Sequence, residues 1–540
     1  MDNTQKSSQA KKLAGAAAIV MSSMIISRIT GFLRSVLISN ALTKVESDAL
    51  LAAFRTSDIM YNMLVGGSIA AALIPILSGY IAKKQEKEGW KAVSSFINAI
   101  FLGMVVISML GSVFAYQLVQ LTAPGLKPDS FILAVKLTRI LFPSVGFIIL
   151  AGFMNGILNS YQRFAAAAYG PSVYNLGTVL SIWVLSRYGV DKVAVGIMCS
   201  AALYFFFQLS FAFRNMKYYR FFIEFRNPGF LKLFALAIPS LISSSIVQVN
   251  TLVSQVYNSH FESGSITAYT NATDTWQLPY GIFAMGLGTA ILPTLSEKLA
   301  LGELDSFKRI MNRGLKTVLL VTIPSAVGFI VLNDPIVSAI YKWSVHFDSS
   351  RILLVGNILS FFSIALLAQS MLALINRAFY ADNDTRTPLY VALGSLALNA
   401  ALGFIFYKAT RLHTPGIALA YSVSSTFNAV VLLYILNKRM KGLNLDKLFV
   451  YVGKILFASA LMALVIFLSR KLFPMDFTVT FHLKLKVLEL IYLFADIALG
   501  SVVFAVAVLW MRLEEAIYIK DLLFGKLRPI WNKITGQIVK

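Results

Sequence analysis

The sequence has few charged residues and almost no cysteine. Charged residues make up 14% of its 540 positions, whereas 57% of the positions are hydrophobic and the mean hydropathy is +0.72. About a quarter of the residues of a typical soluble protein are charged, so this composition excludes an ordinary soluble protein and indicates an integral membrane protein. The single cysteine, Cys199, excludes a disulfide within the chain and a metal cluster held by cysteines.

Other absences narrow the function. The phosphate-binding pattern GxxxxGK[ST] does not occur, so ATP does not drive this chain directly. The loops are short and gather no group of carboxylates at one face, which argues against a membrane glycosyltransferase and against an enzyme in general. All four histidines fall between the apolar runs, which excludes a histidine proton relay inside the membrane: His260, His346, His413 and His482.

Apolar runs of about 20 residues fill the chain from end to end, separated by short polar or Gly/Pro-containing breaks. Each run is long enough to cross a hydrocarbon layer ~30 Å thick. The alternating pattern of β-barrel strands is absent. The sequence therefore predicts an all-α integral membrane protein with about 14 transmembrane helices.

The net charge of +23 is concentrated in alternate loops. The loops KKQEKEGWK (83–91), RNMKYYRFFIEFRNPGFLK (214–232) and NKRMKGLNLDK (437–447) are basic, whereas the intervening loops carry few Lys or Arg. Because membrane proteins retain Lys and Arg in cytoplasmic loops, the pattern predicts cytoplasmic N- and C-termini. It also attributes the basic charge to the membrane surface, so no nucleic acid is expected as a partner.

The sequence repeats itself. AALIPILS (71–78) returns as TAILPTLS (289–296) at a spacing of 218, and a spacing of 217 pairs Asn159 with Asn376 and Pro171 with Pro388. The repeats predict two parallel six-helix lobes around a substrate path, with two helices appended. The predicted domains are an N-lobe (1–222), a C-lobe (223–441), spans 13 and 14 (442–512) and a cytoplasmic amphipathic tail (513–540).

Several charged side chains fall inside the apolar runs, where a charge usually faces a cavity or a partner. Counting 1.5 Å per residue places them at one level, in the outer half of the membrane: Arg28, Arg34, Arg55, Asp58, Arg139 and Asp274. The second repeat has uncharged residues at the positions equivalent to Arg28, Arg34 and Arg55. This asymmetry favours a cavity for an anion, and the planar guanidinium fork suits phosphate or pyrophosphate.

Simpler roles stay open for these residues. Arg55 and Asp58 are three apart on one helix and can neutralise each other, and Arg34 can extend toward the membrane surface. Asn250 and Asn399 are weak candidates for Na⁺ ligands, with hydrogen bonding between helices as the alternative. Glu489 and Asp496 either face a groove or form pairs.

Motifs in this order resemble a known family: SRITGFLRS (27–35), GLGTAILPTLS (286–296) and NRAFYADNDTRTPLYVAL (376–393). They are similar to the MurJ, or MviN, lipid II flippases of the multidrug/oligosaccharidyl-lipid/polysaccharide exporter superfamily. The resemblance implies two lobes forming a cationic central cavity, with spans 13 and 14 lining a groove for the lipid tail.

The same resemblance implies a cargo and a site. The cargo is the undecaprenyl-diphosphate-linked peptidoglycan precursor, moved from the inner to the outer leaflet of the bacterial cytoplasmic membrane. Arg28 and Arg34 match arginines implicated in diphosphate recognition, and Asp48 matches an acidic residue at the start of span 2. Asp274 stands where better-known members carry an arginine, so we hypothesise that Arg55 and Arg139 replace that charge and that Asp274 pairs with a first-half arginine.

Alternatives to a lipid II flippase are an exporter of another polyprenyl-diphosphate-linked glycan, a cation-coupled drug exporter and a membrane glycosyltransferase. The arginine level argues against cationic drugs. No cofactor is expected, and the membrane potential or Na⁺/H⁺ coupling is the expected energy source, since voltage contributes ~2.3 kcal/mol per charge per 100 mV. Membrane lipids are expected partners, and the sequence leaves proteins of cell-wall synthesis open as others.

Overall fold

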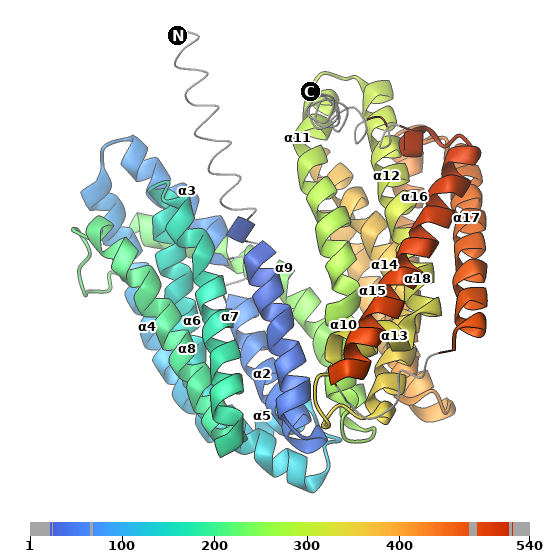
Figure 1. Ribbon diagram of the computed structural model, residues 1–540. Helices are drawn as coiled ribbons and strands as arrows, with labels where there is room; N and C mark the ends of the chain where they lie inside the picture. The colour runs from blue at the N-terminus through green and yellow to red at the C-terminus, as the bar shows by residue number, and fades with distance from the viewer. Residues whose placement is uncertain (1–21, 24, 65–67, 475–482, 518–520, 522–540) are drawn as a thin grey trace, which may run out of the picture. The chain divides into compact units, whose positions relative to one another are not determined.

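The structure is a computed structural model in which every regular element of the described part is a helix (Figure 1). Ten of these helices are long and apolar enough to cross a membrane. The all-α membrane fold is thereby confirmed, and the total of fourteen spans stays a prediction. The described residues are 22–23, 25–64, 68–474, 483–517 and 521, so most of the predicted tail lies outside them.

The chain divides into two compact units, residues 1–270 (unit 1) and 271–540 (unit 2). The first long helix in the described part of unit 1 covers residues 25–41. The other helices of unit 1 are α2 (Lys44–Leu64), α3 (Ser68–Ala82), α4 (Glu86–Val113), α5 (Ala115–Thr122), α6 (Pro128–Ser160), α7 (Phe164–Leu185), α8 (Val190–Ala212) and α9 (Pro228–Ser259).

Helix α6 is the centre of unit 1. It starts at Pro128, where the missing N–H of proline costs nothing because the first turn has no partner for it. Its buried side chains include Leu137, Leu141 and Phe153, and it packs against α2, α3, α4, α5, α7 and α8. Helix α6 therefore holds α2, which carries Arg55, among the other helices of unit 1.

Unit 2 starts within α10, and its last two long helices in the described residues are the appended pair. Its helices are α10 (Ser265–Pro279), a π-helical turn (Tyr280–Met285), α11 (Gly286–Ala300), α12 (Leu304–Val331), α13 (Asn333–Tyr341), α14 (Ser349–Ala381), α15 (Arg386–Ala409), α16 (His413–Arg439), α17 (Leu445–Leu472) and α18 (Leu483–Trp510). Helix α14 occupies the central place that α6 has in unit 1, and packs on α11, α12, α13 and α16.

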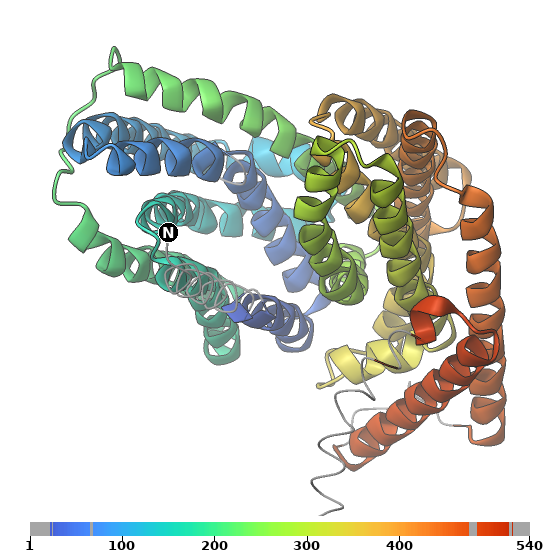
Figure 2. The same cartoon turned by 90° about the horizontal axis from the view of Figure 1, so that it is seen from above.

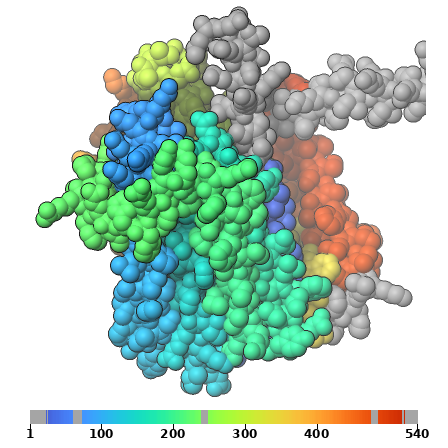
Figure 3. Space-filling model, turned by 90° about the vertical axis from the view of Figure 1, so that its left-hand side faces the viewer, coloured from blue at the N-terminus to red at the C-terminus, as the bar shows by residue number. Residues whose placement is uncertain are grey.

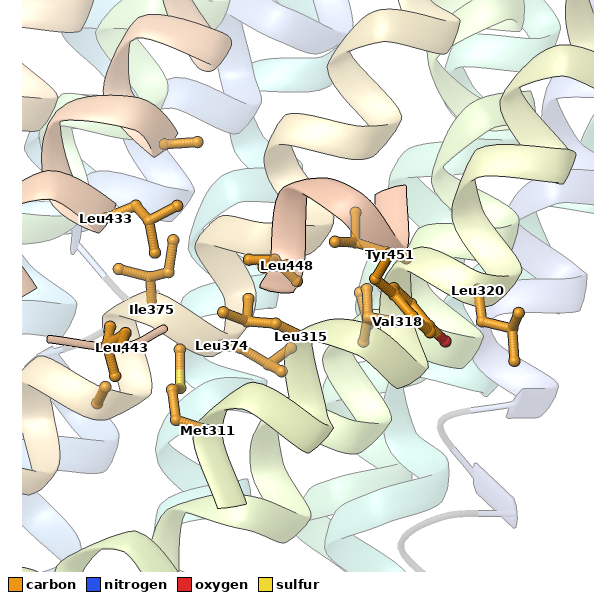
Figure 4. Close-up of a cluster of buried hydrophobic side chains, with 14 of the residues drawn as sticks. Met311, Leu315, Val318, Leu320, Leu374, Ile375, Leu433, Leu443, Leu448 and Tyr451 are labelled. Atoms are coloured by element: carbon orange, nitrogen blue, oxygen red, sulfur yellow. The ribbon is translucent and has the colours of Figure 1, made fainter. Parts of the chain in front are cut away.

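The core of unit 2 lies between α12, α14, α16 and α17. Leu315 of α12, Leu374 of α14 and Leu448 of α17 point toward one another there (Figure 4). Helices α17 and α18 pack side by side, with α17 also on α12 and α18 on α13. The appended pair is thus part of the packed body of unit 2.

The predicted repeat appears in the helices themselves. Helices α3 and α11 end 218 residues apart, at Ala82 and Ala300. Helices α4 and α12 have 28 residues each at the same spacing, and the central helices α6 and α14 have 33 each. The two repeats are confirmed as like-ordered series of helices.

Helix α9 opens the second repeat in sequence but packs within unit 1. It lies against α2, α3, α4 and α5, and Figure 2 shows it in green alongside the blue helices. The contact-based division consequently falls after Thr270, inside α10. The lobe boundary drawn at 222/223 from the repeat stays a prediction.

Candidate functional site

Three of the predicted charged residues come together in unit 1. Arg34 lies on the first helix, and Arg55 and Asp58 lie on α2; both guanidinium groups interact electrostatically with the Asp58 carboxyl group. The Cζ atom of Arg34 lies 5.6 Å from the ring centroid of Phe54. Arg34, Arg55 and Asp58 are half-buried. We call these three residues the arginine cluster.

A capping box forms the turn that brings the two helices together. The N–H and hydroxyl of Thr43 donate to Glu46 Oε2 over 3.0 and 2.9 Å, and the Glu46 N–H donates to Thr43 Oγ1 over 3.3 Å. This reciprocal pair satisfies the first N–H groups of α2. Beyond the turn, Ile38 and Leu42 pack in one core with Leu50. The chain thus reverses, and Arg34 comes to lie near Asp58.

Tyr269 is a member of this site that the sequence reasoning missed. Its hydroxyl interacts electrostatically with Arg55 and shares a side-chain hydrogen bond with Ser254 of α9. The wall of the site therefore includes α9 and the first turns of α10. A single tyrosine in an apolar run carries no pattern that would have identified it.

Asp48 has a different environment. It is buried, with 2% of its surface exposed. Its Oδ2 accepts the N–H of Gly264 at 2.6 Å, and its Oδ1 accepts the N–H and hydroxyl of Thr267 at 2.9 and 2.6 Å. Gly264 has a φ of +101°, a backbone conformation that is strained for any residue with a side chain. Asp48 thus caps the start of α10 from α2, where the helix dipole favours a carboxylate.

Arg28 is exposed on the first helix, beside a contact with α7. The Asn175 side-chain amide donates to the Ser27 carbonyl and hydroxyl over 3.1 and 3.3 Å, which fixes the helix next to Arg28. Gly31 lies one turn further on, and a Cβ at this position would lie 3.6 Å from the nitrogen of the same amide. The structure thus holds the Arg28 backbone in place, and a role in binding stays a prediction.

Arg139 lies on another face of α6. The side of α6 that packs with α2 carries the buried residues Leu137 and Leu141, each two positions from Arg139. Two positions are about 200° around a helix, so Arg139 points away from that side, and it is exposed. The structure does not bring Arg139 into the arginine cluster.

The remaining predicted residues lie elsewhere. Asp274 belongs to unit 2, where it is half-buried and interacts electrostatically with Tyr341. Its pairing with a first-half arginine stays a prediction. Asn250 is half-buried on α9 of unit 1, whereas Asn399 is buried on α15 of unit 2. Their service as Na⁺ ligands stays a prediction as well.

Unit 2 contains an apolar pocket of about 660 Å³ between α12, α17 and α18. Leu320, Pro324 and Gly328 line it from α12, and Gly500 and Phe504 line it from α18. A Cβ on Gly328 would meet nothing within 4 Å, so this helix face is open. Two of its walls, α17 and α18, are the predicted spans 13 and 14, and its lining suits an apolar chain. A groove for a lipid tail stays a prediction.

Buried charges tie the beginning of α18 to α13. Lys342 Nζ lies 2.7 Å from Glu489 Oε1, and the Ser338 hydroxyl donates to Glu489 Oε2 over 3.0 Å. Lys486 Nζ lies 3.4 Å from the same Oε2 and 5.1 Å from the ring centroid of Trp343. Both lysines and Glu489 are at most 3% exposed. We call Lys342, Lys486 and Glu489 the first clasp.

A second clasp follows the end of α18. Lys316 Nζ of α12 lies 3.5 Å from Glu515 Oε1 and 5.1 Å from the ring centroid of Tyr451. The two clasps therefore hold both ends of α18, on either side of the apolar pocket. From the sequence, Glu489 and Asp496 could either face a groove or form pairs. Both have partners: Glu489 is paired with Lys342, and Asp496 accepts a hydrogen bond of 3.0 Å from the Ser469 hydroxyl.

The chain is similar in sequence to known membrane proteins. The sequence model of the family described as "Lipid II flippase MurJ" matches residues 40–488. The "Probable lipid II flippase MurJ" of Rhizobium tropici is 30% identical over 427 residues, which are 76% of this chain and 79% of the relative. The "Lipid II flippase MurJ" of Burkholderia cenocepacia is 25% identical over 429 residues, covering 77% and 82%.

Solved structures give the same picture. "Lipid II flippase MurJ, inward closed conformation" matches with a TM-score of 0.77 and 26% identity, over 94% of this chain and all of that one. A multidrug resistance MATE family transporter of the MOP superfamily, in an inward-facing conformation, matches with a TM-score of 0.67 over 79% of this chain. At 14% identity, the latter match shows a common fold alone.

Proposed function

The chain belongs to the family of lipid II flippases named MurJ, and on that premise we propose that it carries lipid II from the inner to the outer leaflet by alternating access. It is a multi-pass protein of the bacterial inner membrane and a transporter. The observation that carries the proposal is the arginine cluster, which holds two guanidinium groups around one carboxyl group inside unit 1.

The arginine cluster suits the diphosphate of a polyprenyl-diphosphate cargo. Each guanidinium group presents parallel N–H donors to phosphate oxygens, and both are half-buried, so such bonds are stronger than in water. Without cargo, Asp58 offsets part of the positive charge of Arg34 and Arg55. A diphosphate then competes with Asp58 for the two cations.

Asp48 supports the transport cycle in another way. Its three hydrogen bonds hold the start of α10 against α2. A cycle that separates these two helices has to break the bonds. We therefore assign Asp48 to closing one end of the transport path, and the diphosphate to the arginine cluster.

The apolar pocket supports a second contact with the same cargo. Its lining by Leu320, Phe329 and Phe504 matches a polyprenyl chain, whose transfer from water is favourable by ~0.8 kcal/mol per CH₂ group. We infer that unit 2 holds part of the lipid tail between α12 and α18 while the arginine cluster binds the diphosphate.

The basic loops support an orientation with both termini in the cytoplasm. The cargo headgroup is anionic, and the membrane potential contributes ~2.3 kcal/mol per charge per 100 mV, so voltage is a sufficient source of energy. A lipid II flippase acts in peptidoglycan synthesis, and an electrochemical gradient replaces the ATP for which the sequence has no binding motif.

Complementation tests the function. A bacterium depleted of its own lipid II flippase receives the wild type, Arg34→Ala, Arg55→Ala or Arg139→Ala, and surface-exposed lipid II is quantified at equal membrane levels of each protein. We expect the wild type and Arg139→Ala to restore surface lipid II. Arg34→Ala and Arg55→Ala lower it about tenfold or more, equivalent to ~1.4 kcal/mol of lost binding.

Arg139→Ala is the matched control, because it removes the same group from an exposed position outside the cluster. Failure of the wild type, when it is present in the membrane, would refute lipid II as the cargo. Equal activity of all three variants would instead refute the diphosphate site while leaving the cargo assignment standing.

A further inference from the structure

The connection between α8 and α9, residues 213–227, exposes three large apolar side chains. Phe213, Phe221 and Phe225 are 73%, 78% and 65% exposed. The connection contains one 3₁₀ turn and otherwise no regular structure. An aromatic side chain that is exposed to water loses the favourable free energy of its burial. Three exposed rings on one short segment therefore mark an interaction surface.

The connection is fastened to α4 along its length. The Asn98 amide donates to the carbonyls of Arg220 and Phe222 over 3.0 and 2.9 Å, and the Tyr219 hydroxyl donates to Asn98 Oδ1 over 2.5 Å. The Tyr219 ring also meets Trp90 edge to face, with centroids 6.4 Å apart. Asn98 is buried, and its side-chain amide is hydrogen-bonded to the backbone of the connection.

Two serines of α4 complete the attachment. The N–H of Arg220 donates to Ser94 Oγ over 3.2 Å, and the N–H of Glu224 donates to Ser95 Oγ over 3.1 Å. Both serines are fully buried. Because the backbone is held at these points, the outward position of Phe221 is a fixed feature of the fold. Figure 3 shows the green segment on the surface of unit 1, across the blue helices.

The attachment points give the level of the connection in the membrane. Helix α4 has 28 residues and is therefore about 42 Å long, about 12 Å more than the hydrocarbon layer. Its charged residues lie in the first two turns, from Glu86 to Lys91. The remaining 20 residues, from Ser94 to Val113, span about 30 Å. Ser94 and Asn98 therefore lie at the boundary between headgroups and hydrocarbon.

The charges of the connection are mostly positive. Four exposed cations accompany the three rings, whereas Glu224 is the one acidic residue of the segment: Arg214, Lys217, Arg220 and Arg226. Rings interleaved with Arg and Lys are typical of segments that lie in the interface of a membrane with acidic lipids. On the orientation proposed above, this surface faces the cytoplasmic leaflet.

We propose that residues 213–227 are an interfacial anchor that binds anionic phospholipids of the cytoplasmic leaflet. Phe213, Phe221 and Phe225 enter the boundary between headgroups and acyl chains, while Arg220 and Arg226 contact lipid phosphates. Helix α4 holds the anchor at that level through Ser94, Ser95 and Asn98. The anchor thereby fixes the chain where it passes from α8 to α9.

The depth of Phe221 is the first test. Cys199 is the only cysteine, so Cys199→Ser gives a background for single labels. Phe221→Cys carries a spin label, and Leu301→Cys, in the exposed turn between α11 and α12, is the control. The protein is reconstituted in vesicles of phosphatidylethanolamine and phosphatidylglycerol. Relaxation by oxygen reports the hydrocarbon, and relaxation by a nickel chelate reports water.

We expect the label at position 221 to be accessible to oxygen and the label at position 301 to the nickel chelate. Accessibility of position 221 to the chelate would place the ring in water and overturn the anchor. Protection from both reagents would show that protein, such as a second copy of the chain, covers the surface, and would overturn it too. These outcomes do not depend on lipid II transport.

Lipid charge is the second test. Phosphatidylglycerol added to the detergent-solubilised wild type should raise the unfolding temperature more than phosphatidylcholine does. The double variant Arg220→Gln, Arg226→Gln should lose at least half of that difference. The control Lys192→Gln, an exposed lysine of α8 outside the anchor, should keep it. An undiminished difference in the double variant would overturn the assignment of anionic lipid to this surface.

Discussion

Units 1 and 2 share a helical framework but use their internal charges differently. In unit 1 the arginine cluster stays half-buried, and the buried Asp48 is satisfied by backbone N–H groups and a hydroxyl. In unit 2 the clasps set lysine against glutamate with almost no exposure at Glu489. The same framework thus keeps cations half-buried in one unit, where we propose that they bind the cargo, and uses buried cations to hold helices together in the other.

Substitution in the first clasp should give the largest loss of stability, and it tests the difference between the two units most directly. Glu489→Gln removes the anion between Lys342 and Lys486 and leaves two buried cations without compensation, which should cost ~3–5 kcal/mol of folding free energy. Unfolding of the detergent-solubilised protein measures it. Asp305→Asn is the control, since its ion pair with Lys308 is 94% exposed on the aspartate side and contributes ~0–1 kcal/mol. Equal stability of the two variants would remove the distinction between units.

The Asp48 cap in unit 1 should give the next effect. Asp48→Asn removes the charge from a carboxylate that accepts three hydrogen bonds, and we expect a loss of ~1.5–3 kcal/mol in the same unfolding measurement. Asp129→Asn is the matched control, because Asp129 is also at a helix start but is exposed. It should lose at most ~1 kcal/mol. A larger loss in the control would refute the cap as the cause.

A half-buried ion pair in unit 2, between Asp384 and Arg439, should give the smallest effect and a pH dependence. Asp384 accepts hydrogen bonds from the Thr387 hydroxyl and N–H and lies 2.7 Å from Arg439 Nη1. These contacts lower the pKa of Asp384 from 3.8 to about 2. A depressed carboxyl pKa stabilises the folded state above pH 4, and the stabilisation is lost as the pH falls toward 2.

Asp384→Asn should therefore lose about 1 kcal/mol at pH 7 and show a smaller drop in unfolding temperature between pH 5 and pH 3 than the wild type. The control Asp446→Asn, an exposed aspartate in the first turn of α17, should keep the wild-type drop. The opposite sign, a steeper drop in Asp384→Asn, would contradict the depressed pKa.

The framework was predictable because it rests on patterns within single segments. Two eight-residue motifs at a spacing of 218 predicted the repeat, and α3 and α11 reproduce that spacing. The arginine cluster followed from depth alone, since Arg34 and Arg55 lie on neighbouring runs at one level. Arg139 satisfied the same depth criterion, but depth does not give the direction around the helix.

The ties between distant segments were not predictable in this way. Asp48 meets Gly264 and Thr267, which are more than 200 positions away and carry no charge that would announce a partner. Lys342 and Lys486 lie at the edges of apolar runs, where sequence counts assign them to the solvated loops. Packing of α18 against α13 buries both, and no local pattern encodes that packing.

The two clasps determine how a long chain can reach the apolar pocket. Because α18 is tied near Glu489 and again beyond its end at Glu515, the middle of the helix carries neither tie. Small residues line the pocket there, at Gly328 of α12 and at Gly500 and Ser501 of α18. On the proposed function, a flexible lipid tail would therefore enter sideways, along the middle of α18, instead of threading end-on past the charged residues.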